Sequence, residues 1–316
     1  MIAGQDRAVA QFAEAVASGK LHHAWLLAGP RGVGKACFAR AAALRILAEG
    51  AGPPVDLAGL DTPADHPVAH LMAAGSHPDF RLLKRELNDK GDKLRRNISV
   101  DQVRKLGSLF GSTPFLSPWR AVIIDAADDL EAEGANALLK MLEEPPANCL
   151  FLLVAHAPGR LLPTIRSRCR RLDFQPLDDA ALASVLRREL PDADVARLLP
   201  LAEGSAGRAL SYAALDLAPV EAELRALMRD GDPTNSRRSK LAQSLSRKAA
   251  AERYAAFLRL VPSVVAREVL LLDGRKRERA LDAYASVRET VLLAGRLSLD
   301  PGATVFQIGT ALSSIP

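Results

Sequence analysis

The sequence feature that most limits the fold of this chain is a glycine-rich segment, Gly29-Pro-Arg-Gly-Val-Gly-Lys35. It follows an apolar run at 24–28, typical of a buried strand, and precedes a helical pattern over about 35–47. In this context a phosphate-binding loop directs backbone N–H groups and a helix N-terminus at an anion, and the lysine reaches the outer phosphates. A glycine-rich turn that binds nothing is the alternative. The spacing favours a loop of phosphate-binding ancestry, with binding residues Gly29, Gly32, Gly34 and Lys35.

Two side chains that nucleotide hydrolysis requires are missing from this pattern. A working loop has Ser or Thr after the lysine, because the hydroxyl ligates Mg²⁺, but this chain has Ala36. The apolar run at 119–125 ends in Asp125, which could hold a metal ion through water. Hydrolysing ring ATPases have a glutamate next, which polarises the attacking water, and here that residue is Ala126. We therefore expect a nucleotide-binding fold with little or no hydrolysis of its own.

Short apolar runs alternate with helical patterns through the first 175 residues, which is typical of a parallel α/β sheet. Ser99 is a good N-cap for a helix that continues to Phe110. Asp128 and Asp129 are expected as solvated acids at the start of the helix at 131–142. After Pro176 the strand signals stop, and the chain reads as helical to its end. The strands are expected at 24–28, 80–83, 119–125, 150–154 and 171–174.

The composition is that of a globular protein, with 48% hydrophobic and 25% charged residues in 316. An apolar run such as 149–155 is too short to cross a bilayer. Charges in the first eleven residues argue against a secretory signal, and three scattered cysteines suit a reducing compartment, so we expect a cytoplasmic protein without a membrane partner. The net charge is +5 and aromatic residues make up only 4%, so contact with nucleic acid would involve phosphates rather than stacked bases.

A turn rich in arginine comes just before the last expected strand, with four arginines in six positions: Arg166, Arg168, Arg170 and Arg171. A solvated basic turn is the simplest interpretation. In a ring ATPase, however, this location faces the nucleotide of the neighbouring subunit, where an arginine donated in trans stabilises the charge on the transferring phosphate. Arg208, farther along, could point back at a phosphate held by the loop, or it could be a surface arginine after a helix cap.

Three histidines, His66, His70 and His77, have a spacing that could suggest a metal site. No cysteine is nearby and the surrounding sequence is loop-like, so we expect no metal ion there.

In the glycine-rich loop, the strand that ends in Asp125 and the arginine-rich turn, the chain resembles the clamp-loader ATPase subunits, and among them the delta-prime family of the bacterial DNA polymerase III holoenzyme. The pair of stretches at 136–146 and 161–174 is far more specific than the glycine loop. The matching stretches are Gly4-Gln5, His23-Ala24, GPRGVGK at 29–35, HPDF at 77–80, VIIDAAD at 122–128, NALLKMLEEPP at 136–146, LLPTIRSRCRRLDF at 161–174 and EGSAGRAL at 203–210.

The resemblance implies an AAA+ phosphate-loop domain at 1–172, a helical lid at 173–213 and a helical collar at 214–316 that assembles a five-membered ring. It implies motor (gamma/tau) and delta subunits as partners, in a complex that places the sliding clamp on primed DNA. The turn Ser167-Arg168-Cys169 would supply an arginine to the adjacent motor subunit. No cofactor is required and no zinc is expected, because residues 47–76 hold no cysteine. Binding of ATP or ADP without hydrolysis stays open.

Two other functions fit part of the pattern. The first is an autonomous ring ATPase, a motor or helicase-loading subunit that hydrolyses ATP itself. The second is a small-molecule phosphate-loop kinase, which is disfavoured because the long helical half suits assembly better than closure over a substrate.

Overall fold

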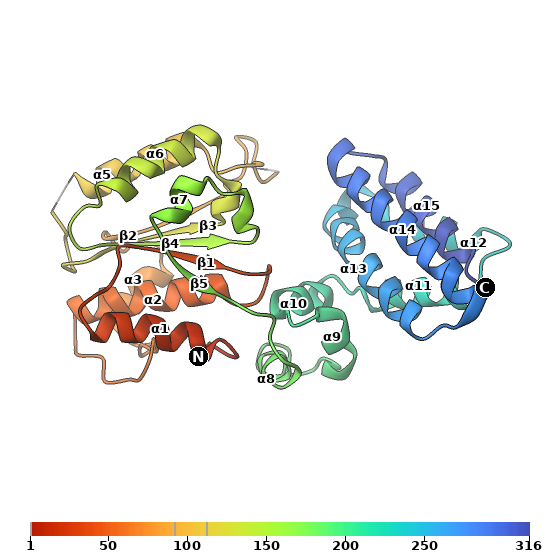
Figure 1. Ribbon diagram of the computed structural model, residues 1–316, viewed down its shortest axis with the longest axis horizontal. Helices are drawn as coiled ribbons and strands as arrows, with labels where there is room; N and C mark the ends of the chain where they lie inside the picture. Colours follow the sequence, from red (N-terminus) through yellow and green to blue (C-terminus); the bar gives the residue numbers. More distant parts are fainter. Residues whose placement is uncertain (1, 92, 112) are drawn as a thin grey trace. The chain divides into compact units, whose positions relative to one another are not determined.

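The computed structural model describes residues 2–91, 93–111 and 113–316, and it divides into two compact units (Figure 1). The first unit is formed by Met1–Val185 with Gly204–Gly207, and the second by Leu186–Glu203 with Arg208–Pro316. The three-domain boundaries given above stay a prediction. Among the described residues, no helix is both long and apolar enough to span a membrane.

The first unit contains a five-stranded sheet in the order β2-β3-β4-β1-β5, with every pair parallel. The predicted α/β class is confirmed, and each expected strand is present within one or two residues of its expected bounds. The strands are β1 (Ala24–Ala28), β2 (Phe80–Lys84), β3 (Arg120–Asp125), β4 (Cys149–Ala155) and β5 (Arg170–Asp173).

Helices cover both faces of this sheet, so β1 and β4 are buried and apolar throughout. Successive side chains of a strand point to opposite faces, which is why Trp25 and Leu27 join one core while Leu26 joins the other. On one face lie α1 (Asp6–Ala17), α2 (Lys35–Gly50) and α3 (Pro67–Ala73); on the other lie α4 (Val100–Arg104), α5 (Leu106–Phe110), α6 (Ala132–Glu143) and α7 (Pro163–Ser167) (Figure 1).

The predicted helix from Ser99 to Phe110 is divided in two at Lys105. Ser99 is its N-cap, as expected, and forms a capping box with Gln102. Gly107 and Ser108 are weak helix formers, and the capping box stabilises only the first turns, which accounts for the division.

The HPDF stretch has a structural role in this unit. The buried carboxylate of Asp79 accepts the backbone N–H groups of Phe115, Leu116 and Ser117 at 2.8, 2.7 and 3.1 Å. Burial alone would raise the pKa of Asp79, but these three donors outweigh it and hold the pKa below its ordinary value. Asp79 thereby fixes the loop that leads into β3.

The second unit is helical and has one apolar core, which includes Leu224, Phe257, Leu260, Val264 and Ile308. It includes the end of α8 (Asp179–Glu189), most of α10 (Ala206–Ala214), α9 (Val195–Ala202), α11 (Ala218–Asp230), α12 (Ser236–Leu245), α13 (Ala251–Leu270), α14 (Gly274–Leu297) and α15 (Pro301–Ser313).

Candidate phosphate-loop site and arginine turn

The glycine-rich segment joins the end of β1 to the start of α2, as predicted. Gly29, Gly32 and Gly34 have φ values of +153°, +80° and +104°, which L side chains rarely adopt. Space is also lacking, because a Cβ on Gly29 would lie 2.2 Å from the carbonyl oxygen of Phe174. Lys35 is the first residue of α2, so the helix N-terminus opens at the loop.

Three hydrogen bonds from distant parts of the first unit hold the loop in place. The Gln5 side chain donates to the Val33 carbonyl of the loop at 3.1 Å, and it is itself fixed by a bond to the Gln175 carbonyl at 2.8 Å. Ser205 Oγ donates to the Arg31 carbonyl at 2.9 Å, and the Gly207 N–H donates to the Gly32 carbonyl at 3.0 Å. The resemblance marked these stretches, but the sequence alone did not assign Gln5 or Ser205 a role.

Lys35 is buried, and its ammonium lies within the curl of the loop. Nζ donates to the Gly29 carbonyl at 2.6 Å and also to the Pro30 carbonyl. Burial lowers the pKa of Lys35 to about 8, although the carboxylates of Asp128 and Asp125 act in the opposite direction. The pKa of the ammonium in the loop is therefore about one unit above neutral pH.

The acidic residues after β3 correct one prediction. Asp125 ends the strand and is half-buried, as expected. Asp128, however, is no solvated first-turn acid: it lies in the 3₁₀ turn Ala127–Asp129 and accepts the backbone N–H groups of His156 and Ala157, the latter at 3.0 Å. Asp129 pairs with Arg85 at 3.1 Å. The two acids connect strand ends and come before α6 rather than starting it.

His156 is a site residue that the sequence analysis missed. It follows β4, the strand between β1 and β3, and so reaches the same edge of the sheet as Lys35. Burial lowers the pKa of His156, and the nearby cations Lys35 and Arg31 lower it further. The carboxylates of Asp128 and Asp125 act in the opposite direction but do not outweigh these effects. Its Nδ1 is buried without a hydrogen-bond partner among the described residues. Its position directly after an apolar run is the signal that could have identified it.

The chemistry of this edge is limited by two methyl groups. The loop, Lys35 and Asp125 provide the elements that hold a nucleotide phosphate. Ala36 follows the lysine in α2, and Ala126 is almost fully buried after Asp125. A methyl group neither ligates Mg²⁺ nor polarises water, so these positions lack the groups that drive hydrolysis.

Arg168 caps the C-terminus of α7, and its guanidinium is held by two acceptors. Nη1 donates to the Thr164 carbonyl at 3.1 Å, and Nη2 lies 2.7 Å from Oε1 of Glu143 in α6. Its neighbours in the turn differ: Ser167 Oγ donates to the Thr164 carbonyl, while burial raises the pKa of the Cys169 thiol to about 12. Cys169 is therefore a packed thiol, and Arg168 is the charged group of the turn.

The other arginines of this turn have different surroundings. Arg166 is exposed. The guanidinium of Arg170 lies over the Trp25 ring, 4.8 Å from its centroid, and Arg171 pairs with Asp173 at 2.7 Å. These differences mean that substitutions of the four arginines can be distinguished experimentally.

Arg208 belongs to the second unit, where its guanidinium pairs with Glu203 at 2.5 Å. Its predicted approach to a phosphate at the loop stays a prediction.

The three spaced histidines have separate local roles. His66 Nδ1 accepts the Val68 N–H at the start of α3, and His77 Nδ1 accepts the Asp79 N–H. His70 is exposed. Within the residues that the structure describes, no three His, Cys, Asp or Glu side chains gather in a metal-binding arrangement.

A parallel sheet in the order β2-β3-β4-β1-β5, with a phosphate loop after β1, an acid at the end of β3 and a helical part that follows, fits an AAA+ type of fold. A gamma-subunit-related protein of DNA polymerase III from Thermotoga maritima has this fold, with a TM-score of 0.52 over 96% of this chain and 98% of that one, at 18% identity. The family model described as DNA polymerase III, delta subunit, matches residues 4–178, and the chain belongs to this family.

Relatives match about three fifths of the chain. The delta′ subunit of DNA polymerase III from Pseudomonas aeruginosa is 36% identical over 189 residues, which cover 60% of this chain and 54% of that protein. The gamma/tau subunit from Mycobacterium tuberculosis is 32% identical over 196 residues, covering 59% of this chain and 30% of that one. The chain thus spans about half the length of the delta′ relative, or less for gamma/tau.

Proposed function

We propose that this chain is the non-hydrolysing, delta-prime subunit of a DNA polymerase III clamp loader, which places the sliding clamp on primed DNA. The observation that carries the proposal is the combination of a well-formed phosphate loop with methyl groups at Ala36 and Ala126. Such a site can retain a nucleotide for architecture while lacking the groups for turnover. We expect the protein to work in the cytoplasm, and its partners are motor (gamma/tau) and delta subunits in a five-membered ring.

The active contribution of the chain is then an arginine given to a neighbour. Arg168 is partly exposed, lies at the end of a short helix, and is held by groups that an incoming phosphate can replace. In the ring its guanidinium would stabilise charge on the phosphate transferred at the adjacent motor site. Neither a cofactor nor zinc is required, and whether ATP or ADP binds at Lys35 without hydrolysis stays open.

Assembly is the direct test of this function. The purified chain is mixed with gamma/tau and delta subunits of the same organism, and the molar mass of the products is measured by light scattering. A single complex containing all three chains is expected. If the chain stays separate from both partners, the proposal is wrong.

An autonomous ring ATPase is the second candidate, and the intact loop with Lys35 and Asp125 favours it. It predicts nucleotide turnover by the isolated chain, whereas the delta-prime function predicts none.

A further inference from the structure

A groove on the second unit has a polar lining in which basic residues predominate. It has a volume of about 560 Å³ and lies between α11, α12 and the start of α13. Its polar lining consists of Ser236, Arg237, Lys240, Ser244, Arg253 and a single carboxylate, Glu223. Three cations against one carboxylate give the groove a net charge of +2. Such a lining fits a ligand that offers acceptors and negative charge.

The surrounding sequence increases the positive charge of this surface. Residues 233–251 contain five cations and no Asp or Glu. Arg237 forms an ion pair with Glu223 at 3.1 Å. Arg253 donates only to the neutral backbone carbonyl of Asp216, and Lys240 is exposed. Two cations of the groove therefore have no carboxylate partner among the described residues, and Arg247 and Lys248 continue the basic row beyond α12.

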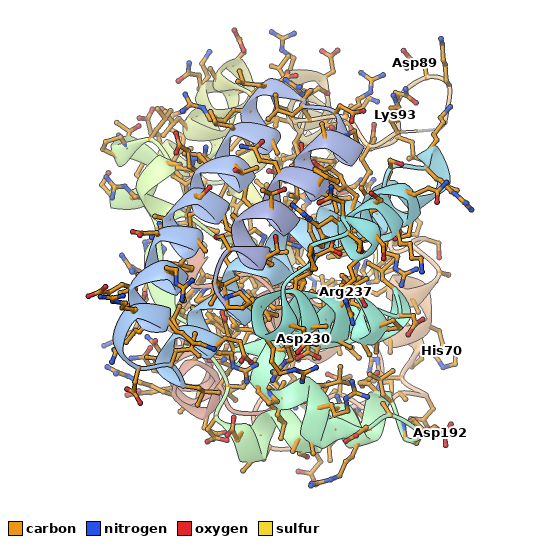
Figure 2. The ribbon with its side chains drawn as sticks, turned by 90° about the vertical axis from the view of Figure 1, so that its right-hand side faces the viewer. His70, Asp89, Lys93, Asp192, Asp230 and Arg237 are labelled. Atoms are coloured by element: carbon orange, nitrogen blue, oxygen red, sulfur yellow. The ribbon has the colours of Figure 1, made fainter. Side chains whose placement is uncertain are left out.

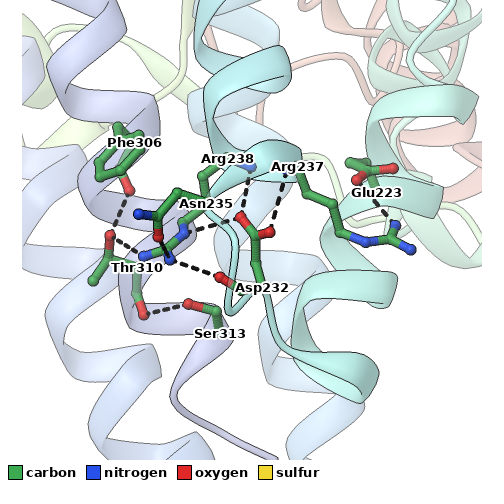
Figure 3. A network of polar contacts seen from close by, with 8 residues as sticks. All are labelled: Glu223, Asp232, Asn235, Arg237, Arg238, Phe306, Thr310 and Ser313. Atoms are coloured by element: carbon green, nitrogen blue, oxygen red, sulfur yellow. Dashed lines mark hydrogen bonds and ion pairs between the residues drawn. The ribbon is translucent and has the colours of Figure 1, made fainter.

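One of these five cations, Arg238, points inward and fixes the helix that also carries Arg237 and Lys240 (Figure 3). The buried carboxylate of Asp232 lies 3.1 Å from Arg238 Nε and accepts the Arg238 N–H at 3.0 Å. The Arg238 guanidinium also donates to Thr310 in α15 at 2.9 Å and to Asn235. These bonds attach the start of α12 to α15, so the helix that carries Arg237 and Lys240 is a rigid support. Figures 2 and 3 show Arg237 on this helix.

The chemistry of the groove distinguishes between two kinds of anionic ligand. A peptide that binds through apolar anchors as well as charge would find little to contact, because Val220 and Leu241 are only 3% and 6% exposed and Pro219 is the one exposed apolar residue among those described in the lining. No aromatic residue is among those described as lining the groove, so it offers no stacking surface for bases. What remains is a row of cations and hydroxyls, which matches a chain of phosphates.

We propose that this groove binds the phosphodiester backbone of DNA. Contact is independent of base sequence and is made by Lys240, Arg253 and Arg237, with the Ser236 hydroxyl as a further donor; the Ser244 hydroxyl already donates to the Leu241 carbonyl at 2.8 Å. The inference goes beyond the proposed function, which requires only assembly and Arg168 from this chain. DNA binding can be measured on the isolated chain, so its failure is distinct from a failure of assembly.

The test is fluorescence anisotropy of the full chain with a labelled 20-nucleotide single strand and a labelled 20-base-pair duplex, at several salt concentrations. Lys240→Glu is expected to weaken binding at least tenfold, and Lys240→Ala to reduce the slope of log K against log salt by about 0.7 for the single strand or 0.9 for the duplex. The matched control is Lys276→Glu, an equal charge change at an exposed position on α14. It should change affinity less than twofold, and all variants should keep the wild-type melting temperature.

The relative loss with the two probes shows whether single-stranded or duplex DNA is the ligand, and a loss with either supports the proposal. Equal weakening by Lys240→Glu and Lys276→Glu would mean attraction to the whole protein, and would overturn it. Binding that neither Lys240 variant changes would overturn it as well. A third outcome would also overturn it: displacement of DNA by a peptide of eight glutamates at equal charge concentration, because the groove would then accept any polyanion.

Discussion

Arg168 and Glu143 form an ion pair in which Nη2 lies 2.7 Å from Oε1, and the two residues belong to different elements of the first unit. Glu143 is the last residue of α6, while Arg168 directly follows α7. Their side chains are 47% and 35% exposed, and pairs of this kind contribute at most about 1 kcal/mol. The pair therefore orients the guanidinium without holding it strongly, so a phosphate from a neighbouring subunit can compete for it.

Replacing Arg168 tests the role in trans. Arg168→Ala should leave the chain folded and the complex assembled, while single-turnover hydrolysis at the adjacent motor site falls by about 10³-fold or more, as for arginine fingers generally. Turnover of the whole complex falls less, because other sites keep their own arginines. Arg166→Ala and Arg170→Ala are the controls, measured at two salt concentrations. Equal and strongly salt-dependent losses from all three variants would identify a basic patch instead of a finger.

Glu143 is expected to act as a positioning residue for Arg168. Glu143→Ala removes one of the two acceptors of the guanidinium, so motor-site hydrolysis should fall a few-fold, while Glu144→Ala should have no effect. The double variant Arg168→Ala/Glu143→Ala should be no slower than Arg168→Ala alone, because Glu143 has nothing left to orient. Additive losses in this double-mutant cycle would show that Glu143 acts independently of Arg168.

The strands and the phosphate loop could be predicted because their signals are local. An apolar run such as 149–155 reports burial on both faces of a sheet, and the glycines before Lys35 report a backbone with positive φ. Ser99 can be predicted as an N-cap because serine before a helical pattern favours that position, and the structure adds its capping-box partner, Gln102.

The contacts that complete the site depend on the fold and have no local pattern. Gln5 donates to a carbonyl 170 positions away, and Ser205 to one 174 positions away. Asp128 was assigned to the next helix because first-turn acids are common there, but the backbone N–H groups after β4 compete for its carboxylate. Only the neighbouring position of β3 and β4 in the sheet reveals this competition.

The isolated chain should hydrolyse no ATP. Ala36→Thr restores an oxygen ligand, so it should increase the dependence of nucleotide affinity on Mg²⁺ without restoring turnover, because Ala126 still cannot polarise water. Phosphate release by the purified protein is the measurement. Turnover by the wild-type chain that disappears in Lys35→Ala would contradict this prediction, since a contaminating ATPase would not respond to that substitution.

Nucleotide affinity should depend on pH through Lys35. Its pKa of about 8 means that the ammonium, the form that attracts phosphate, is lost above that pH in the free protein. Bound phosphate raises the pKa, so affinity is constant below pH 8 and falls by up to tenfold per pH unit above it. Titration of a fluorescent ADP analogue from pH 7 to 9.5 measures this. Lys35→Arg should give a flat profile, and a flat wild-type profile would mean that the ammonium does not contact the phosphates.

Asp79 should make the first unit sensitive to acid. Its pKa is lower in the folded chain than in the unfolded chain, so its stabilisation is complete above about pH 4, the ordinary value, and is lost as pH falls through the folded pKa. Asp79→Asn keeps one acceptor but faces an NH₂ group toward backbone N–H donors, which should cost about 1–3 kcal/mol at pH 7. The free energy of unfolding is measured in urea from pH 7 to 2, and the difference between wild type and Asp79→Asn should close on acidification.

Asp89→Asn, at a side chain 93% exposed, is the control and should follow the wild-type curve. A gap that stays constant down to pH 2 would mean that the charge of Asp79 does not stabilise the 115–117 loop.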